Sequence, residues 1–529
     1  MSDRYDNSVD YIVIGAGTAG CVLANRLSID THVKVTLLEF GGMDSNPAIY
    51  DRGMNPMFSL WNPQGAENWG YATTPQPGLN GRSIDIARGK VLGGSSAVNA
   101  MIYIRGNRRD FAGWSQSGNR GWTYEEVLPY FKKSETYHGP ISPYHGDNGP
   151  ISIIDYQQPS IVSHAFVEAA ATLGATQKNN DFNGASQEAG AGFYQATQTL
   201  DGKRSSAASA FVRPIMERKN FQLLSQVRVT RLLIEHGRVH GVEYASPDGV
   251  QTLYAEREVI LCCGAFETPK LMMLSGLGPA EQLATHAIPV VQDLPGVGRN
   301  LQDHLLLGVG YESLVPLNPP SLLAEAGLFT WTPQGSKQAS PDLQYFFGPV
   351  QFLAPEYTTN GPGFTFAPIL TQPLSRGTVT LASSDPTALA RLDPQYLSRD
   401  EDLAVLEYGI RYARELAHTT AFDKLRGREL APGSAVTSSS ALRDYIRKVA
   451  GTVWHPAGTC KMGSDSEAVV DDQLRVHGIE GLRIADASVM PTLVNGNPNA
   501  AIMMIAEKAA DLIRNDQTAP MKMELIVSM

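Results

Sequence analysis

Cysteine is scarce in this chain, with 4 among 529 residues. Cys262 and Cys263 are adjacent in an apolar run that predicts a strand, whereas Cys21 and Cys460 lie far from them along the chain. This spacing is neither that of a disulfide framework nor that of a zinc site. We therefore predict no metal site and a reducing, cytoplasmic environment.

Long apolar runs and an excess of positive charge are also missing. No stretch approaches the roughly 18 uncharged apolar residues of a transmembrane helix, and the polar, acidic first ten residues do not resemble a secretory signal. Lys and Arg number 43 against 53 Asp and Glu, a net charge of -10. An acidic chain without a basic cluster is not attracted to nucleic acid or anionic lipid. We expect neither partner, and the sequence leaves the oligomeric state open.

The N-terminal region has the pattern of a dinucleotide-binding βαβ unit. An apolar run at residues 10–14, a Gly-rich turn, a helical pattern at residues 20–27 and an apolar run at residues 34–38 follow one another, and Glu39 ends the second run. In such a turn the first glycine permits the bend, the second admits a pyrophosphate, and the third allows close packing of helix and strand. The acid is placed to bind a ribose hydroxyl. The turn consists of Gly15, Ala16, Gly17, Thr18, Ala19 and Gly20.

Further elements are predicted along the rest of the chain. Alternating runs at Phe221–Leu224, Arg228–Glu235 and residues 239–244 indicate a small antiparallel meander that leads into a buried strand at residues 257–262. Apolar and small residues at helical spacing predict a last helix at residues 501–513. Because 529 residues exceed what one hydrophobic core serves, we expect at least two packed regions in a mixed α/β (α+β) fold.

A second segment with an accessible backbone, residues 88–100, contains three glycines and two serines. It suits a planar, extended cofactor that lies against the main chain, because glycine has no side chain to keep the cofactor away. A plain Gly-rich loop has the same composition, so this segment alone does not establish a cofactor site.

Several segments together resemble the glucose-methanol-choline (GMC) oxidoreductases over essentially the whole chain. They are residues 88–106, 264–279, 294–304, 455–459 and 486–499. Within the family the sequence is most similar to the branch of choline oxidases, choline dehydrogenases and bacterial FAD-dependent alcohol dehydrogenases. The resemblance implies FAD as the cofactor and oxidation of a primary alcohol to the aldehyde by hydride transfer to flavin N5.

The resemblance also implies two interleaved domains. A Rossmann-type FAD-binding domain would comprise residues 1–155, 204–306 and 454–529. A substrate-binding domain, built on an antiparallel sheet flanked by helices, would comprise residues 156–203 and 307–453.

The residues expected around FAD come from the fingerprint and from the resemblance. By position, the main chain of Val229 would contact adenine, Asp486 would lie beside the diphosphate or ribityl chain, and residues 93–100 would line the isoalloxazine. The full expected set is Gly15, Gly17, Thr18, Ala19, Gly20, Glu39, Arg88, Val91, Gly93, Gly94, Ser95, Asn99, Ala100, Val229, Gly264, Asp486, Ala487, Asn497 and Pro498.

His455 and Asn499 are the candidate catalytic residues. A lone histidine in an apolar run is more often a satisfied core residue, and an asparagine before a helix is a common N-cap. The resemblance nevertheless assigns both to catalysis and places Asn499 opposite His455. A histidine with a pKa of about 6.5 can accept the hydroxyl proton, and an asparagine can hydrogen-bond the developing alkoxide.

Three positions depart from the choline-oxidising branch. Val98 stands where choline oxidases carry the histidine that tethers FAD, so we expect non-covalent FAD. Leu306 replaces the carboxylate that balances the ammonium of choline, and Phe346 replaces an active-site histidine, unless the alignment is shifted by a residue or two. A trimethylammonium without a charge partner is disfavoured in a desolvated pocket, although aromatic side chains could still hold it. With Val453 and Trp454, these residues form the expected pocket, which favours uncharged aliphatic or aromatic alcohols.

Alternatives remain open at this point. The electrons can pass to molecular oxygen or to a quinone or artificial acceptor, and a choline-type dehydrogenase is a further possibility. Hydroxynitrile lyases and light-driven fatty-acid decarboxylases resemble the same family, so the fold does not fix the reaction. A flavin-binding protein without catalysis would need neither His455 nor Asn499.

Overall fold

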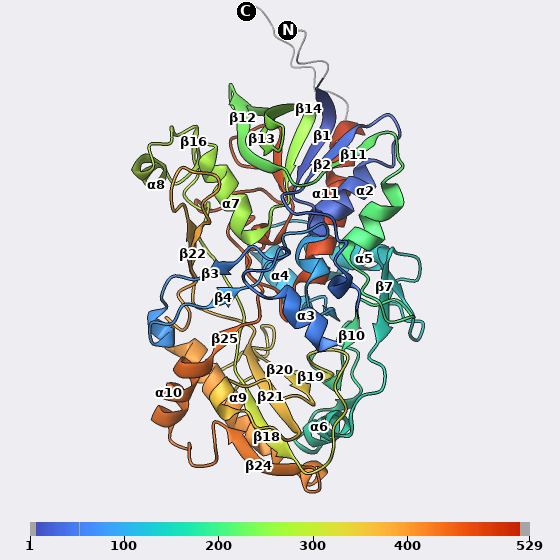
Figure 1. Cartoon of the computed structure of the whole chain (residues 1–529), viewed down its shortest axis with the longest axis vertical. Helices are drawn as coiled ribbons and strands as arrows, with labels where there is room; N and C mark the ends of the chain where they lie inside the picture. Colours follow the sequence, from blue (N-terminus) through green and yellow to red (C-terminus); the bar gives the residue numbers. More distant parts are fainter. Residues whose placement is uncertain (1–6, 52, 519–529) are drawn as a thin grey trace, which may run out of the picture.

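The computed structural model of the chain describes residues 7–51 and 53–518. A seven-stranded sheet and a nine-stranded sheet lie toward opposite ends of the molecule, with helices packed around and between them (Figure 1). Each sheet has its own large hydrophobic core. The fold is mixed α/β, as the sequence predicts.

The seven-stranded sheet contains the predicted Rossmann unit. Its order is β11-β2-β1-β14-β13-β12, and β26 pairs with β14. All four residues of β2 are buried, as expected of a parallel strand that is covered on both faces. The bounds are β1 Ser8–Ile14, β2 Val35–Leu38, β11 Phe221–Leu224, β12 Arg228–Glu235, β13 Arg238–Ser246, β14 Gly249–Leu261 and β26 Leu482–Ile484, with helix α2 at Thr18–Leu27.

Two details of this sheet differ from the sequence-based predictions. Strand β11 is not part of the antiparallel meander but pairs in parallel with β2, with Phe221 opposite Val35. An apolar run shows that a strand exists but does not identify its neighbour. Strand β14 ends at Leu261, so Cys262 and Cys263 follow the strand and lead into α7 (Gly264–Leu274). The meander itself, β12-β13-β14, is confirmed.

The nine-stranded sheet is almost entirely antiparallel. Its order is β24-β18-β21-β20-β19-β9-β8, with β17 beside β21 and β25 beside β17. Strand β17, at residues 305–306, belongs to this nine-stranded sheet, although the sequence analysis placed these two residues at the end of a segment of the FAD-binding domain. The domain boundaries stay a prediction. The bounds are β8 Gln177–Lys178, β9 Gly190–Phe193, β17 Leu305–Leu306, β18 Val309–Ser313, β19 Ala326–Thr330, β20 Leu343–Gly348, β21 Gly363–Leu370, β24 Arg426–Ala431 and β25 Gly451–Thr452.

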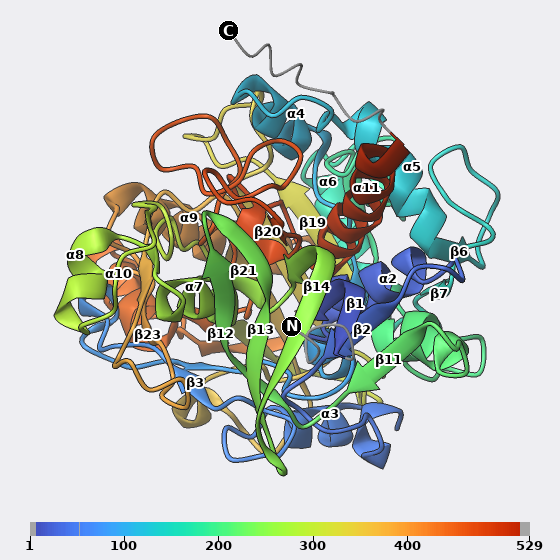
Figure 2. The same ribbon diagram turned by 90° about the horizontal axis from the view of Figure 1, so that it is seen from above.

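Helices cover both sheets and the region between them. Seen from above, α2 and α11 lie to one side of β14 and α7 lies to the other (Figure 2). Helix α11 corresponds to the predicted last helix but begins earlier, at Asn499. In the part of the chain that the structure describes, no helix is both long and apolar enough to cross a membrane. The remaining bounds are α3 Met54–Leu60, α4 Arg108–Gln116, α5 Tyr124–Ser134, α6 Ile161–Thr172, α8 Ala280–Thr285, α9 Asp400–Ala417, α10 Ser439–Val449 and α11 Asn499–Thr518.

Candidate cofactor cavity and catalytic centre

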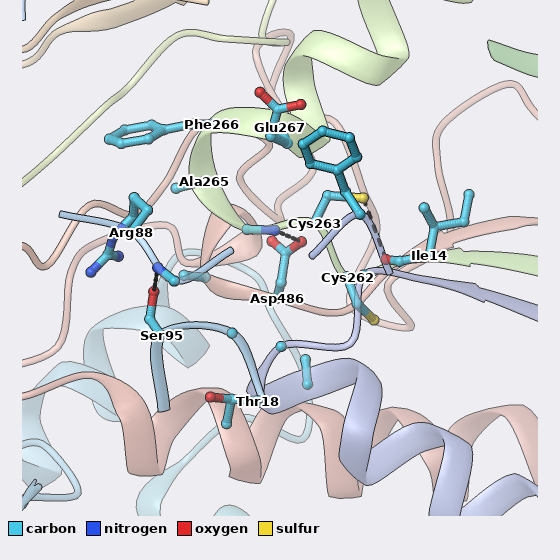
Figure 3. Close-up of a pocket in the computed structure, with 18 of the residues that line it drawn as sticks. Ile14, Thr18, Arg88, Ser95, Cys262, Cys263, Ala265, Phe266, Glu267 and Asp486 are labelled. Carbon is cyan, nitrogen blue, oxygen red and sulfur yellow. Dashed lines mark hydrogen bonds between the residues drawn. The ribbon is translucent and has the colours of Figure 1, made fainter. Parts of the chain in front are cut away.

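A cavity opens at the carboxyl ends of β1, β2, β14 and β26 (Figure 3). The ends of parallel strands form such a crevice because the helices that follow turn away to opposite faces of the sheet. Much of the predicted cofactor set lines this cavity. The lining members of that set are Gly15, Gly17, Thr18, Ala19, Glu39, Arg88, Gly94, Ser95, Val229, Gly264, Asp486, Ala487 and Pro498.

Glycines shape the floor of the cavity by allowing close backbone contacts. Gly15 has a φ of +95°, and a Cβ on Gly20 would lie 1.9 Å from the Gly15 carbonyl oxygen. A Cβ on Gly94 would lie 2.7 Å from the Cα of Gly17, so the two Gly-rich segments are in direct contact. A Cβ on Gly17, in contrast, would meet no protein atom within 4 Å. Gly17 therefore leaves its backbone open toward the cavity.

Glu39 joins the end of β2 to the Gly-rich turn. Its carboxylate accepts hydrogen bonds from the backbone N–H groups of Ala16 (2.8 Å) and Gly41 (2.7 Å). Burial raises the pKa of Glu39 to about 7, although these N–H groups oppose the shift. The carboxylate thus fixes the turn and also borders the cavity, where it can bind a hydroxyl group.

Asp486 links the end of β26 to the start of α7. Its carboxylate accepts hydrogen bonds from the Gly264 N–H (2.8 Å), the Thr268 hydroxyl (2.6 Å) and the Ser488 N–H (2.8 Å). Burial raises the pKa of Asp486 above its ordinary value. Because these contacts hold strand end, loop and helix together, Asp486 is a rigid part of the cavity wall.

Two of the predicted cofactor residues that do not line the cavity hydrogen-bond to neighbouring segments. The Gly93 N–H donates to the Ala16 carbonyl (2.7 Å), and the Arg204 guanidinium donates to the Asn99 side-chain oxygen (2.7 Å). Arg204 is buried, which lowers its pKa to about 10. The predicted residues that do not line the cavity are Gly20, Val91, Gly93, Asn99, Ala100 and Asn497.

An aromatic wall of the cavity escaped the sequence analysis. Phe40 and Trp69 stack with their ring centroids 5.1 Å apart, and the Arg228 guanidinium lies 3.9 Å from the centre of the Phe40 ring. All three side chains line the cavity. Phe40 directly follows Glu39 and Arg228 directly precedes Val229, so their places beside motif residues were the only signal available.

His455 is buried, with 8% of its surface exposed, and both ring nitrogens have partners. Nε2 lies 3.3 Å from Nδ2 of Asn497, and Nδ1 lies 3.0 Å from Nδ1 of His304. The backbone N–H of His455 donates to Asp303 (2.8 Å). Burial, together with the neighbouring His304 and Arg88, keeps the pKa of His455 well below its ordinary value. The ring is therefore neutral at neutral pH.

The structure corrects the expected pairing of His455 with Asn499. The amide beside His455 is that of Asn497, whereas Oδ1 of Asn499 accepts a hydrogen bond from the Thr18 hydroxyl (2.7 Å). Asn499 is the first residue of α11, and Asn497 precedes Pro498 outside the helix. The two side chains diverge because the chain changes conformation between them. Asn499 thus faces the Gly-rich turn, and Asn497 faces the histidine.

The residues expected to form the substrate pocket fall into separate apolar clusters. Leu306 and Phe346 are buried in one cluster, against which Val453 packs. Val98 belongs to a second cluster, whose partner Trp61 donates its indole N–H to the Val98 carbonyl (2.7 Å). The Trp61 ring also packs edge-on against Trp454, with 4.6 Å between ring centroids. Trp61, which the sequence analysis did not identify, thus connects Val98 with Trp454, and Trp454 packs against a third cluster. The pocket as a whole stays a prediction.

Comparison with known protein families identifies the family of this chain. Residues 9–306 match the N-terminal model and residues 373–506 match the C-terminal model of the GMC oxidoreductases. The chain belongs to the GMC oxidoreductase family. The predicted resemblance is therefore confirmed, and the protein is an oxidoreductase.

Three relatives of this GMC oxidoreductase cover nearly all of its length. It is 40% identical to an oxygen-dependent choline dehydrogenase of Sinorhizobium fredii, over 96% of both chains. It is also 40% identical to an alcohol dehydrogenase [acceptor] of Pseudomonas putida, over 95% of both chains. Among solved structures, pyridoxine 4-oxidase from Mesorbium loti is 33% identical with a TM-score of 0.88, and the alignment covers 96% of this chain and 99% of that one.

Proposed function

We propose that the protein oxidises an uncharged primary alcohol to the aldehyde, with FAD as a non-covalently bound cofactor. The observation that carries this proposal is the 3.3 Å contact between His455 Nε2 and Asn497 Nδ2. It combines a neutral proton acceptor with a hydrogen-bond donor, which are the two groups that an alcohol oxygen requires as it loses its proton.

The residues present fit an FAD molecule. Gly17 leaves room for a pyrophosphate at the N-terminus of α2, and Glu39 borders the cavity where a ribose hydroxyl would lie. Val98 has no nucleophilic atom, and its side chain packs in an apolar cluster with Ile49 and Leu60, so it cannot form a covalent tether. Bound FAD would supply the acceptor for the hydride that leaves the alcohol carbon.

His455 and Asn497 have different roles in the removal of the hydroxyl proton. Because burial keeps the His455 ring neutral, Nε2 can accept the hydroxyl proton of the substrate without first losing one. The Asn497 amide can donate a hydrogen bond to the same oxygen as negative charge develops on it. Asp303 holds the His455 backbone N–H and keeps the histidine in place.

The apolar cluster around Leu306 and Phe346 supports an uncharged substrate. Among its buried members only Tyr194 has a polar side-chain atom, and that hydroxyl donates to the Tyr345 carbonyl (2.8 Å). A quaternary ammonium placed here would lose its hydration without gaining a carboxylate partner. Two relatives at 40% identity differ in their named substrates, so choline belongs in the test.

Purified yellow protein should be mixed anaerobically with short and long aliphatic, benzylic and furanic alcohols, a sugar and choline. We expect loss of the visible flavin band with one class of uncharged alcohol, and none with a His455→Ala variant that retains FAD. Admission of air, or addition of a quinone, then identifies the electron acceptor. An unchanged band with every alcohol would contradict the proposal and favour lyase or light-driven chemistry. Acid precipitation of the protein should release FAD into the supernatant.

A further inference from the structure

A continuous chain of hydrogen bonds runs from Asn497 through His455 and His304 to a backbone carbonyl. Asn497 Nδ2 lies 3.3 Å from His455 Nε2, and His455 Nδ1 lies 3.0 Å from His304 Nδ1. His304 Nε2 lies 3.1 Å from the carbonyl oxygen of Thr371. His304 is fully buried, and burial lowers its pKa to about 3, so its ring is neutral.

The positions of the protons in this chain follow from its two ends. A carbonyl oxygen only accepts, so the single N–H of neutral His304 must be at Nε2, where it donates to Thr371. Nδ1 of His304 is then unprotonated and can only accept. The neighbouring Nδ1 of His455 must therefore carry the proton of that ring, which leaves His455 Nε2 unprotonated. The Asn497 amide, a donor, faces this nitrogen, in agreement with the assignment.

We propose that His304 is a positioning residue that holds His455 in the tautomer whose Nε2 is free to accept a proton. The inference rests on the proposed function for its catalytic meaning, but the tautomer itself follows from the contacts alone. Without the acceptor at His304, only the Asn497 amide would keep the proton off Nε2, and that amide could turn its oxygen toward Nε2 and accept the proton instead. A protein molecule in which His455 Nε2 already carries the proton cannot use that nitrogen as the base.

The same contacts determine where the substrate proton stays. After transfer from the hydroxyl oxygen to His455 Nε2, the ring carries both N–H groups, and Nδ1–H still donates to His304. His304 cannot pass a proton onward, because its other nitrogen already donates to a backbone carbonyl. Thr371 is itself fixed, since its N–H donates to Asp342 (3.1 Å) and its hydroxyl donates to Pro341 (2.7 Å). The proton therefore leaves Nε2 on the side where the substrate binds.

Among the residues that the structure describes, no carboxylate hydrogen-bonds the ring of His455 or of His304. Asp303 is close, but its oxygens accept from the backbone N–H groups of His304 and His455 and from the hydroxyls of Thr452 and Tyr396, not from either imidazole ring. Arg88 is the charged group that acts on the His455 ring, and it disfavours the protonated form. A neutral acceptor at Nδ1 fixes the tautomer without the stronger pull toward the cation that a carboxylate would exert.

The tautomer can be read directly in the holoenzyme labelled with ¹⁵N-histidine. His455 resonances are assigned by their loss in a His455→Gln variant, and the nitrogen chemical shifts and N–H couplings show which nitrogen carries the proton. We expect a protonated Nδ1 and a bare Nε2 at neutral pH. A proton on Nε2 in the wild-type protein would overturn the proposal, whatever the activity. The expected tautomer without any alcohol oxidation would refute only the proposed function.

Two variants of His304 test its effect on catalysis. His304→Leu removes the acceptor, whereas His304→Gln offers an amide oxygen toward His455 and an amide N–H toward Thr371. For His304→Leu we expect a mixture of His455 tautomers and a fall in kcat of about 10- to 100-fold with little change in KM, because a general base contributes roughly 10²–10⁴-fold. His304→Gln should restore one tautomer and most of kcat. Equal losses in both variants, with FAD bound and a single His455 tautomer in each, would show a purely structural role and contradict the proposal.

Discussion

Asn497 Nδ2 lies 3.3 Å from His455 Nε2, while Asn499, two residues further on, hydrogen-bonds the Thr18 hydroxyl. The two asparagines therefore serve different parts of the molecule. One faces the candidate catalytic histidine, and the other connects the start of α11 to the Gly-rich turn of the cofactor cavity.

This division predicts opposite effects of two alanine substitutions. Asn497→Ala should lower kcat for the best alcohol by about 100-fold, the usual cost of losing one hydrogen bond to a developing oxyanion. Asn499→Ala should change kcat little but weaken FAD binding by roughly fivefold, since it removes a hydrogen bond of about 1 kcal/mol beside the turn. Anaerobic flavin reduction and FAD titration measure the two quantities. A reversed ranking would restore Asn499 as the partner of His455.

Because Leu306 stands where a carboxylate would balance the charge of choline, a carboxylate introduced at this position should shift the substrate preference toward choline. Leu306→Glu should raise kcat/KM for choline relative to benzyl alcohol by about tenfold or more, because tenfold corresponds to only about 1.4 kcal/mol of charge stabilisation. Leu306→Gln has the same size without the charge and is the matched control. If both variants show the wild-type ratio while retaining FAD, Leu306 does not face the substrate.

Substitution of Gly17 should weaken FAD binding without affecting the fold. A Cβ at this position meets no protein atom within 4 Å, so Gly17→Ala should leave the Tm of the FAD-free protein unchanged. The methyl group would nevertheless occupy the place of the pyrophosphate, and FAD affinity should fall by at least about tenfold. Gly113→Ala, in α4, also adds a Cβ without neighbours and should change neither quantity. Unaltered FAD affinity in Gly17→Ala would move FAD away from this turn.

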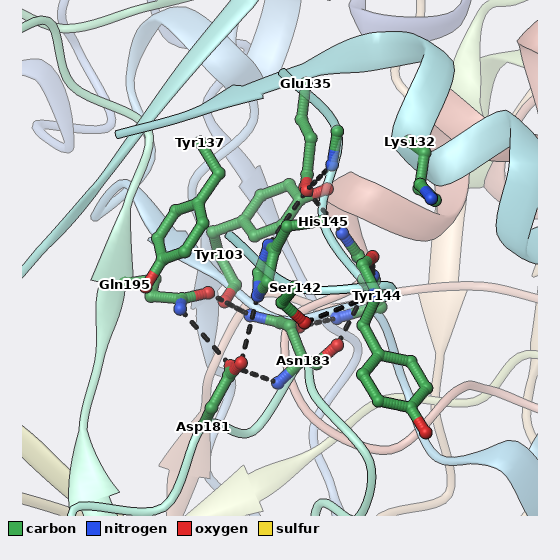
Figure 4. A network of polar contacts seen from close by, with 12 residues as sticks. Tyr103, Lys132, Glu135, Tyr137, Ser142, Tyr144, His145, Asp181, Asn183 and Gln195 are labelled. Carbon is green, nitrogen blue, oxygen red and sulfur yellow. Dashed lines mark hydrogen bonds and ion pairs between the residues drawn. The ribbon is translucent and has the colours of Figure 1, made fainter. Parts of the chain in front are cut away.

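The contacts of the His145 ring predict a pH-dependent contribution to the free energy of unfolding (Figure 4). Its two ring nitrogens lie 2.9 Å from carboxylate oxygens of Glu135 and Asp181, and both carboxylates only accept, so both nitrogens must donate. Burial alone would lower the pKa of His145, but the hydrogen bonds to Asp181 and Glu135 outweigh it and raise the pKa. This stabilisation is fully present below the unfolded pKa of about 6.5 and is lost as pH rises through the folded pKa.

Thermal unfolding of wild-type protein and His145→Gln over a range of pH measures this contribution. The wild-type advantage should reach about 2 kcal/mol near pH 6, as expected for hydrogen bonds to charged groups, and shrink as the pH is raised above 6.5. His32→Gln alters an exposed histidine and should match the wild-type curve. A stability difference that stays constant with pH would show that His145 is neutral in the folded protein.

The parts of the fold that were predicted correctly are those that depend on patterns within a short stretch of sequence. Strand, turn, helix and acid from residues 10–39 lie in one short stretch, and each element is specified by its own neighbours in sequence. The meander β12-β13-β14 is local for the same reason. Strand β11 was misassigned because its partner, β2, lies far away along the chain, and an apolar run of four residues fits any neighbouring strand.

The sequence by itself determined the family, the mixed α/β fold and the Gly-rich turns, since these depend on residue types at short, fixed spacings. Only the tertiary structure decided that Asn497 rather than Asn499 reaches His455, that His304 contacts the same ring from 151 residues away, and that Trp61 connects Val98 with Trp454. These contacts depend on where distant segments are packed to within a hydrogen-bond length, a precision that residue spacing along the chain does not contain.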